Sequence, residues 1–258
     1  MYLDRIIADH RAAAARDHRN LDDLVARAGS VEPTRGFANR LRRDSLESLA
    51  VIAEIKRRSP SKGDLHPDLD PAALARTYES AGASCISVLT DESFFGGSVD
   101  DLQAARSAVA VPVLRKDFTV GPRDVCDARL MGADCLLLIV AALDPDELRS
   151  LHELALGLGL DVLVETHDER EIEQALAVGA RLIGVNQRDL RTFEVDHERA
   201  LRVVGSMPPE VIKVAESGVR GAADAASLRS AGYDAVLVGE TLLVSDDPGS
   251  ALRSLRSR

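Results

Sequence analysis

The chain has 258 residues, of which 45% are hydrophobic and 29% charged, and its formal net charge is -10 at pH 7. This apolar content allows one large core and excludes an intrinsically disordered chain, and 18 glycines are too few for a collagen-like repeat. The acidic balance argues against binding to nucleic acid or to an anionic membrane, because both need clustered lysine and arginine. We therefore expect no nucleic-acid partner and no membrane partner, and any phosphate that the protein binds should be small and locally held.

The cysteines and the N-terminus favour a cytoplasmic protein. Cys85, Cys126 and Cys135 are an odd number without CxxC spacing, which excludes a disulfide framework and a four-cysteine zinc site and fits a reducing compartment. No run in the sequence approaches the ~20 apolar residues of a membrane span. The charged first residues lack the apolar core of a secretion signal.

Residues 1–47 precede the first strand-like run. Segments 1–18 and 21–28 have the spacing of helices, and segment 34–44 is a basic third segment. No linker rich in proline or serine separates these segments from the first strand-like run. We therefore predict an N-terminal helical extension packed on the rest of the chain, with residues 1–258 forming a single domain.

Eight short apolar runs come after this extension, each of strand length and rich in valine, isoleucine and leucine. They are residues 49–56, 84–90, 111–117, 134–140, 161–166, 181–186, 211–217 and 235–240. Continuous apolar runs are typical of parallel strands that are covered on both faces. The segments between them have helical spacing, with acidic starts and glycine stops.

A glycine recurs about every 50 residues, before each even-numbered strand, at Gly82, Gly132, Gly179 and Gly232. Such a glycine can end a helix in the left-handed conformation. Four units of two strand–helix steps make eight strands, which predicts an α/β fold, a closed (β/α)8 TIM barrel. The alternative is an open doubly wound sheet, which usually has a GxGxxG turn after its first strand, and RRSPSKG at 57–63 lacks that pattern.

Polar residues stand near the carboxyl ends of five predicted strands, where the active sites of such barrels lie. Because residues two apart share a face of a strand, we expect one cluster at the mouth of the barrel, formed by Glu54, Lys56, Lys116, Glu165, Asn186 and Glu216. Buried carboxylates and amines are unfavourable unless paired, and their pKa values shift readily. Ion pairs that merely close the barrel are the alternative, but six such residues from five strands favour an active site.

Only four of the 32 basic residues are lysines. A lysine amine can transfer a proton, which an arginine cannot, so position decides which lysines are functional. Lys62 lies in a loop with glycine, where we predict a solvated side chain, although a loop that closes over a substrate could use it. Lys213 lies on the opposite face of its strand from Glu216, and we predict a structural salt bridge for it. His167 closely follows Glu165, and we interpret it as a loop residue.

The last two strands end in small residues, Ser217-Gly218 and Gly239. Small residues let backbone N–H groups approach an anion, and the loops after strands 7 and 8 are the usual phosphate site of these barrels. Two plain turns that need glycine are the alternative. The six histidines lack HxxxH spacing, so we expect no metal site.

Six segments carry a resemblance to the indole-3-glycerol-phosphate synthase family that covers the whole chain. They are VIAEIKRRSPSKG (51–63), SVLTDESFFGGS (87–98), LRKDF (114–118), LVETH (163–167), IGVNQRDL (183–190) and VAESGV (214–219). The combination of ExKxxSPS with RKDF and NxRDL is specific.

The resemblance implies a carbon–carbon lyase of tryptophan biosynthesis that acts on 1-(2-carboxyphenylamino)-1-deoxyribulose 5-phosphate. The aromatic carbon that bears the carboxylate attacks the ribulose carbonyl, carbon dioxide leaves, and loss of water gives indole-3-glycerol phosphate. This chemistry needs an acid at the carbonyl oxygen, a cation for the carboxylate, a base and a phosphate anchor. It implies no organic cofactor, because the aryl amine supplies the electrons.

The resemblance also implies roles for the cluster. Lys116 matches the general acid of the family, and Lys56 matches the residue that holds the substrate carboxylate. Glu165 and Glu54 match its catalytic carboxylates, one for removing a proton and one for stabilising cationic intermediates, and the sequence leaves this division open. Asn186 matches a hydrogen-bonding residue.

The substrate-binding residues implied are Ser59, Phe95, Phe118, Arg188, Glu216, Ser217, Gly218, Gly239 and Glu240. Phe95 and Phe118 match apolar walls for the anthranilate ring, and the last four match the phosphate site. Glu240 stands where some relatives have serine, so a phosphate contact there would come from its backbone N–H.

Two alternatives remain open. Another phosphosugar barrel, such as phosphoribosylanthranilate isomerase, needs one acid and one base and has no evident use for two inward lysines. A non-catalytic metabolite-binding barrel would not need both glutamates and both lysines. In each case the partner expected is a small phosphosugar, with no obligate protein partner.

Overall fold

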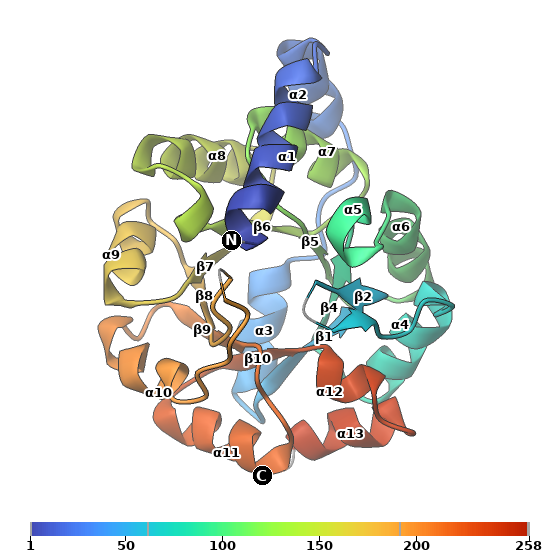
Figure 1. Cartoon of the computed structure of the whole chain (residues 1–258), viewed down its shortest axis with the longest axis vertical. Coiled ribbons are helices and arrows are strands. Elements are labelled where there is room, and N and C mark those ends of the chain that lie inside the picture. The colour runs from blue at the N-terminus through green and yellow to red at the C-terminus, as the bar shows by residue number, and fades with distance from the viewer. Residues whose placement is uncertain (1, 61, 191, 257–258) are drawn as a thin grey trace.

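The computed structural model describes residues 2–60, 62–190 and 192–256. Eight parallel strands form a closed barrel in which strands that follow each other along the chain are neighbours (Figure 1). They are β1 (Ala50–Ile55), β4 (Cys85–Leu89), β5 (Val113–Lys116), β6 (Cys135–Ile139), β7 (Asp161–Thr166), β8 (Leu182–Asn186), β9 (Ile212–Glu216) and β10 (Ala235–Val238). The predicted (β/α)8 barrel is confirmed, with strands one or two residues shorter than most of the apolar runs.

Helices surround the barrel and join its strands. They are α4 (Pro71–Ser80), α5 (Glu92–Phe95), α6 (Val99–Ala108), α7 (Pro122–Leu130), α8 (Pro145–Gly157), α9 (Glu169–Ala177), α10 (Arg199–Val203), α11 (Ala222–Ala231), α12 (Glu240–Leu243) and α13 (Pro248–Leu255), with 3-10 turns η1 (Val140–Ala142) and η2 (Val204–Ser206). The four repeating glycines all have positive φ, between 81° and 104°, at the ends of α4, α7, α9 and α11. Their predicted role as left-handed helix stops is therefore confirmed.

Side chains alternate between two apolar layers, as the pleat of a strand requires. Ile52, Leu114 and Leu163 belong to a cluster inside the barrel. Val51 and Ala53, the neighbours of Ile52 along β1, belong to the cluster between the barrel and its helices. Because the inward positions below the mouth are mostly apolar, the polar residues at the mouth stand above an apolar core.

The N-terminal extension consists of α1 (Tyr2–Arg16), α2 (Leu21–Gly29) and α3 (Phe37–Ser45), which confirms its helical character. Helix α3 lies across the barrel axis in Figure 1, and its Phe37 and Leu41 are fully buried in the inner cluster. The α3 residue Ala38 donates its backbone N–H to Asp161 at the start of β7, so α3 closes the amino ends of the strands. These contacts support a single domain over residues 1–258, which remains a prediction.

The loop after β1 contains a small hairpin of β2 (Arg58–Ser59) and β3 (Gly63–Asp64). It lies beside α5, and the Arg58 guanidinium donates to the Glu92 carbonyl of α5 at 3.2 Å. The hairpin therefore stands at the carboxyl end of the barrel, between the ends of the first two strands.

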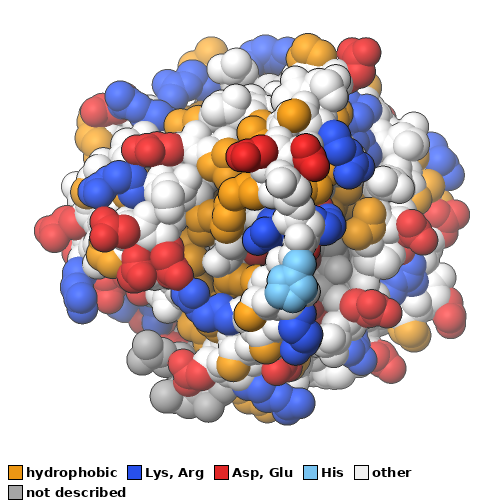
Figure 2. All heavy atoms as spheres, turned by 90° about the horizontal axis from the view of Figure 1, so that it is seen from above, with side chains coloured by type: hydrophobic (Ala, Val, Ile, Leu, Met, Phe, Trp, Pro, Cys, Tyr) orange, Lys and Arg blue, Asp and Glu red, His pale blue; other side chains and the backbone are white. Residues whose placement is uncertain are grey.

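Positive and negative side chains are interspersed on the face that carries α1 and α2, without a continuous basic field (Figure 2). In the part of the chain that the structure describes, none of the helices has the length and apolar character needed to cross a bilayer.

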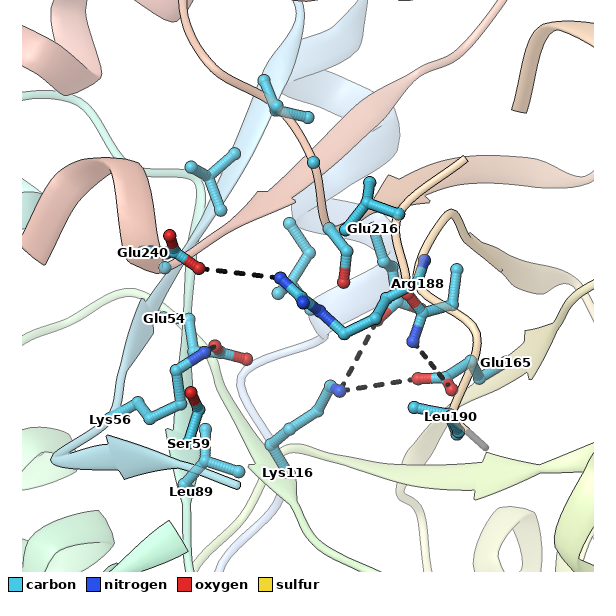
Figure 3. Close-up of a pocket in the computed structure, with 18 of the residues that line it drawn as sticks. Glu54, Lys56, Ser59, Leu89, Lys116, Glu165, Arg188, Leu190, Glu216 and Glu240 are labelled. Atoms are coloured by element: carbon cyan, nitrogen blue, oxygen red, sulfur yellow. Dashed lines mark hydrogen bonds and ion pairs between the residues drawn. The ribbon is translucent and has the colours of Figure 1, made fainter. Parts of the chain in front are cut away.

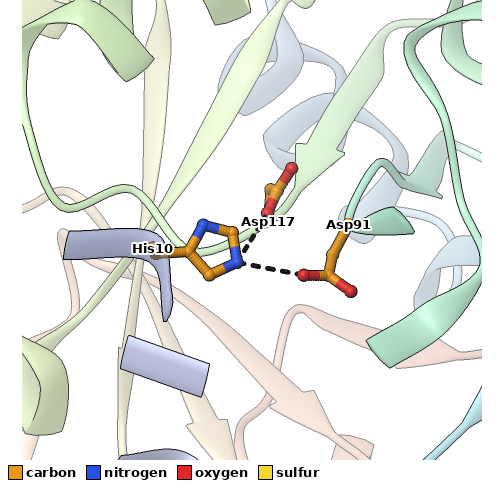
Figure 4. A group of neighbouring side chains, drawn as sticks. All are labelled: His10, Asp91 and Asp117. Atoms are coloured by element: carbon orange, nitrogen blue, oxygen red, sulfur yellow. Dashed lines mark hydrogen bonds and ion pairs between the residues drawn. The ribbon is translucent and has the colours of Figure 1, made fainter. Parts of the chain in front are cut away.

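His10 of α1 joins the extension to the mouth of the barrel (Figure 4). Its Nε2 lies 3.0 Å from Oδ2 of Asp91, which caps α5, and 3.8 Å from Oδ1 of Asp117, which follows β5. The His10 ring also lies 5.4 Å from the Phe118 ring. Burial lowers the pKa of His10, but the hydrogen bond with Asp91 and the charges of Asp117, Asp91 and Asp124 outweigh burial, so that its pKa is raised above 6.5.

The protonated form of His10 should therefore stabilise the fold. We expect His10→Gln to lower the free energy of unfolding by about 1–2 kcal/mol near pH 6, the size of a charged hydrogen bond. Because the folded pKa lies above 6.5, this contribution is complete below pH 6.5 and is lost as the pH rises through the folded pKa.

Urea unfolding of both proteins from pH 5.5 to 9 measures this difference, with exposed His18→Gln as the control. A His10→Gln difference that stays constant over this range would show that His10 does not act through its charge.

Candidate active site

A cavity of about 330 Å³ opens at the carboxyl ends of the barrel strands. The structure brings all fourteen site residues predicted from the sequence into its wall: Glu54, Lys56, Ser59, Phe95, Lys116, Phe118, Glu165, Asn186, Arg188, Glu216, Ser217, Gly218, Gly239 and Glu240. The strand-borne members come from β1, β5, β7, β8 and β9. The wall thus combines an apolar side, a charged floor and a side formed by small residues.

The charged floor is centred on Lys116, which reaches toward two carboxylates (Figure 3). Its Nζ lies 3.5 Å from Oε2 of Glu165 and 3.7 Å from Oε2 of Glu216. The Asn186 side-chain amide donates to the other oxygen of Glu165 at 3.1 Å. Directly after β1, the Lys56 ammonium donates to Oε1 of Glu54 at 2.6 Å. Two cations thus compensate three buried carboxylates.

The strand register explains how these side chains meet. Asn186 of β8 pairs with Glu216 of β9, and Glu165 of β7 pairs with Gly184 of β8. A Cβ at Gly184 would lie 2.0 Å from Oε1 of Glu216. Only glycine therefore leaves room for the Glu216 carboxylate, a requirement that sequence reasoning missed although Gly184 shares a face with Asn186.

Burial and charge give the floor residues different protonation states. Burial lowers the pKa of Lys116, but the charges of Glu165, Glu216 and Glu54 outweigh burial and raise it. Burial raises the pKa of Glu54, but the charges of Lys56 and Lys116 outweigh burial and lower it. Burial and the charge of Glu165 together raise the pKa of Glu216 to about 8, against the pull of Lys116. Near neutral pH the site therefore has an ammonium at Lys116, a carboxylate at Glu54 and a neutral acid at Glu216.

The turns after β9 and β10 leave no room for a side chain at Gly218 or Gly239. Ser217 and Gly218 both have positive φ, 64° and 71°, which is uncommon for the serine. A Cβ at Gly218 would lie 2.6 Å from Val195, and one at Gly239 would lie 2.6 Å from Oε1 of Glu54. A ligand can therefore approach the backbone closely, and a side chain at Gly239 would disturb Glu54 as well as an anion.

Basic side chains surround the same end of the cavity. Lys62 of the β2–β3 hairpin forms an ion pair with Glu240 of α12, and an Arg188 guanidinium nitrogen lies 3.6 Å from the other Glu240 oxygen. Lys62 is half exposed, but it is not simply solvated as predicted, because it joins the loop after β1 to the start of α12. Two cations and the backbone of two tight turns can hold a phosphate here.

The opposite side of the cavity is apolar. The Phe95 and Phe118 rings lie 6.2 Å apart and tilted, as walls of one slot. Leu137 and Ile139 of β6 add to this wall. A flat aromatic ring fits such a surface better than a sugar does.

The strand pattern alone does not predict the surroundings of four polar residues, which are Lys213, His167, His197 and Arg220. Lys213 contributes no ion pair to any carboxylate of the described residues, so its predicted salt bridge is wrong; it contacts Asp234 only through its backbone. His167 lies in a loop, as expected, and outside this cavity. His197 and Arg220 line the cavity but were missed, because they belong to loops whose path the strand pattern does not predict.

His10, Asp91 and Asp117 are the described side chains that could together offer three metal-ligating atoms within 4.8 Å of one another. Their atoms already have partners. One Asp91 oxygen accepts the backbone N–H groups of Phe94 and Phe95, and one Asp117 oxygen accepts from the Arg115 guanidinium at 3.0 Å. The cluster therefore acts as an ion-pair network that holds α1 against the barrel.

In a comparison with protein families, a family model matches nearly the whole chain. The family model for "Indole-3-glycerol phosphate synthase" matches residues 3–255. An indole-3-glycerol phosphate synthase of Mycolicibacterium smegmatis is 51% identical over 255 residues, which are 98% of this chain and 93% of that protein. Indole-3-glycerol phosphate synthase 2 of Streptomyces coelicolor is 51% identical over 245 residues, covering 95% and 93%.

Solved structures with little sequence identity share the fold. An N-acetylmannosamine-6-phosphate 2-epimerase from Clostridium perfringens aligns with a TM-score of 0.60 at 12% identity, over 77% of this chain and 90% of its own. A thiamine phosphate pyrophosphorylase from Pyrococcus furiosus aligns with a TM-score of 0.60 at 16% identity, over 82% and 95%. At these identities the likeness shows the fold alone.

The neutral state of Glu216 leads to a stability prediction. A carboxyl whose folded pKa is about 8 stabilises the fold most below its ordinary pKa of 4.5, and this contribution is lost as the pH rises to about 8. Glu216→Gln keeps the shape and cannot ionise. We expect the free energy of unfolding of the variant, relative to that of the wild type, to increase by about 1 kcal/mol or more from pH 5 to pH 9, since one pKa unit corresponds to ~1.4 kcal/mol.

Chemical unfolding at both pH values measures this gain. The prediction is wrong if the variant is equally or less stable relative to wild type at pH 9 than at pH 5.

Proposed function

The chain belongs to the indole-3-glycerol phosphate synthase family, and we propose that it converts 1-(2-carboxyphenylamino)-1-deoxyribulose 5-phosphate into indole-3-glycerol phosphate. The observation that carries this proposal is the Lys116 ammonium held between Glu165 and Glu216, in a cavity with an aromatic slot at one end and an anion site at the other. The substrate has the same three parts: an aryl acid, a reacting carbonyl and a phosphate.

Binding at the two ends orients the substrate over the charged floor. The backbone N–H groups around Ser217-Gly218 and Gly239-Glu240 hold the phosphate, with Lys62 and Arg188 beside them. The anthranilate ring lies against Phe95 and Phe118. The substrate carboxylate then takes Lys56 as its partner, and Ser59 lies beside it. This placement brings the reacting carbon and carbonyl together without any motion of the barrel.

Lys116 is the acid of the ring closure. Its raised pKa keeps it charged before the reaction, and it gives its proton to the carbonyl oxygen as the new bond forms. The ring nitrogen then carries positive charge, which Glu54 stabilises because its lowered pKa keeps it ionised. Carbon dioxide leaves when the electrons of its bond return to the ring.

Glu165 is the base of the later proton loss. Glu54 suits this task less, because its pKa is lowered and one of its oxygens is taken by Lys56. Asn186 orients the Glu165 carboxylate through a hydrogen bond to one oxygen. Glu216, as a neutral acid, gives its proton to the hydroxyl, which leaves as water. It regains a proton from Glu165, which holds the one lost from carbon, through Lys116 between them. These surroundings support the proposed division of roles between the two glutamates, which the sequence left open.

The proposal also covers the cofactors, the cellular compartment and the partners of the enzyme. The reaction needs no organic cofactor and no metal, because the aryl nitrogen supplies the electrons and Lys116 the proton. Cys85, Cys126 and Cys135 are buried and unpaired, which suits a reducing cytoplasm. The only partner required is the phosphosugar substrate.

One assay tests the function. Incubation of the purified protein with the carboxyphenylamino-deoxyribulose phosphate should produce indole fluorescence. An isomerase of phosphoribosylanthranilate, or a barrel that only binds metabolites, would produce none from this substrate. Absence of the indole product with folded protein would therefore refute the proposal.

Lys116→Arg tests the acid. The variant keeps the charge, but a guanidinium has a pKa above about 12 and does not give up its proton readily. We expect kcat to fall about 10²-fold or more, the scale of a general acid, while KM changes less.

Lys213→Arg is the matched control, because Lys213 lies away from the cavity and its ammonium has no ion pair among the described residues. Lys62→Arg is unsuitable as a control, since Lys62 lines the phosphate end. If Lys116→Arg keeps a kcat near the wild-type value, Lys116 acts only as a charge and the acid is another group.

A further inference from the structure

Glu165 stands between the substrate cavity and a second cavity. The second cavity, of about 530 Å³, lies beside α9 and α10, and most of the residues that line it are charged. His167 and Glu171 line the second cavity but not the first, and Leu190 lines both. The wall between the two cavities is therefore only about one side chain thick at this point.

The side chain of His167 spans this wall. Its Nε2 lies 3.8 Å from Oε1 of Glu165, and its Nδ1 lies 3.0 Å from Oε2 of Glu171. The same Glu171 oxygen accepts the backbone N–H of His167 at 2.7 Å, which fixes the orientation of the loop. Glu171, in the first turn of α9, is 18% exposed and so reaches water.

One ring nitrogen of His167 is left without a hydrogen-bond partner. His167 Nε2 is buried and forms no hydrogen bond with any described residue, although it is aimed at Glu165. A buried nitrogen is rarely left so, and its separation from Glu165 exceeds hydrogen-bond length by less than 1 Å. Catalytic hydrogen bonds are often long in a free enzyme and tighten when the substrate binds.

The proposed reaction consumes one proton in each turnover, and a path through His167 would supply it. The substrate carboxylate leaves as neutral carbon dioxide, so the organic product has one negative charge fewer than the substrate. One proton must therefore enter from water in each turnover. A substrate that fills the first cavity covers Lys116 and Glu165 from the mouth of the barrel, which leaves the mouth unsuitable as the route of entry.

We propose that His167 carries protons between the water of the second cavity and Glu165. The His167 imidazolium gives its Nε2 proton to Oε1 of Glu165, leaving a neutral ring and a neutral carboxyl. The Glu165 carboxyl passes a proton on to the Lys116 amine, which has just given its own to the substrate oxygen. The proton left on Nδ1 then moves to Nε2 by tautomer exchange, and Nδ1 takes a proton from cavity water by way of Glu171, which restores the imidazolium.

The charges around the ring suit a group that holds and releases a proton. Glu165 of β7 and Glu171 of α9 face it, and Arg199 of α10 opposes them. Burial lowers the pKa of His167, but the hydrogen bond with Glu171 and the two carboxylate charges outweigh burial and Arg199, so that its pKa is raised. The charged form of the ring therefore persists to higher pH than in an ordinary histidine, and this form supplies the first proton.

The alternative is a structural role, in which His167 only fastens the start of α9. Two substitutions separate the roles. His167→Asn places an amide near the position of Nδ1, so it can keep the bond to Glu171 but cannot relay a proton. Glu171→Gln keeps an acceptor for the His167 backbone N–H but cannot take up a proton. His18→Asn, at an exposed position of the extension, is the control.

Steady-state kinetics with the carboxyphenylamino-deoxyribulose phosphate give the result. We expect His167→Asn to lower kcat about 10-fold or more with KM unchanged, less than a group that acts directly on the substrate. Glu171→Gln should lower kcat in the same direction. Added imidazole, entering the second cavity, should restore kcat of His167→Asn in proportion to its protonated form and should leave the wild type unchanged.

The inference rests on the proposed function, and the outcomes separate the two. No product from the wild type refutes the function, and the relay with it. If the wild type forms product and the His167→Asn variant has the same kcat, the relay is refuted and the proposed function is not. A loss of kcat that imidazole does not restore, with a similar loss of thermal stability, assigns His167 the structural role and also overturns the relay.

Discussion

The burial of one ammonium among three carboxylates is the constraint on which the active site depends. Lys116 lies within 4 Å of Glu165 and Glu216, and its charge also reaches Glu54. Removing such charges from water is unfavourable unless each has a partner. Here the partners are unequal in number, so one carboxyl, Glu216, has to keep its proton. The imbalance itself thus produces an acid, a charged amine and an ionised carboxylate in one small volume.

The rest of the fold holds this imbalance in place. The parallel strands position each side chain at a fixed height along the barrel. The inner apolar layer beneath the ion pairs limits their contact with water. Gly184 makes room for Glu216, and the tight turns at Gly218 and Gly239 bring the backbone close to the anion end. The extension closes the amino ends of the strands through α3 and meets the mouth through His10. If these parts moved at each turnover, the short distances that set the charge states of Lys116, Glu54 and Glu216 would be lost.

The strands and their inward residues could be predicted from the sequence, because the period of two in a strand decides which side chain points inward. Glu54, Lys116, Glu165, Asn186 and Glu216 all follow from that rule. Contacts between loops could not be predicted in the same way. The pairing of Lys62 with Glu240 joins residues 178 positions apart, and neither lies within a strand. The position of Lys213 on the face of its strand opposite Glu216 predicts a salt bridge, but no carboxylate of the described residues pairs with its ammonium, and Asp234 accepts only its backbone N–H.

Charge states were likewise beyond the sequence, because they depend on distances of a few ångströms. The chain offers a direct way to observe them, since it contains only four lysines. NMR titration of the side chains in a lysine-labelled sample, with Lys116→Arg to assign the resonance, gives the pKa of Lys116 in the free enzyme. The carboxylates around Lys116 should keep its amine protonated beyond the ordinary value of 10.5. A Lys116 amine that loses its proton below that value would contradict the claim that the buried carboxylates hold it charged.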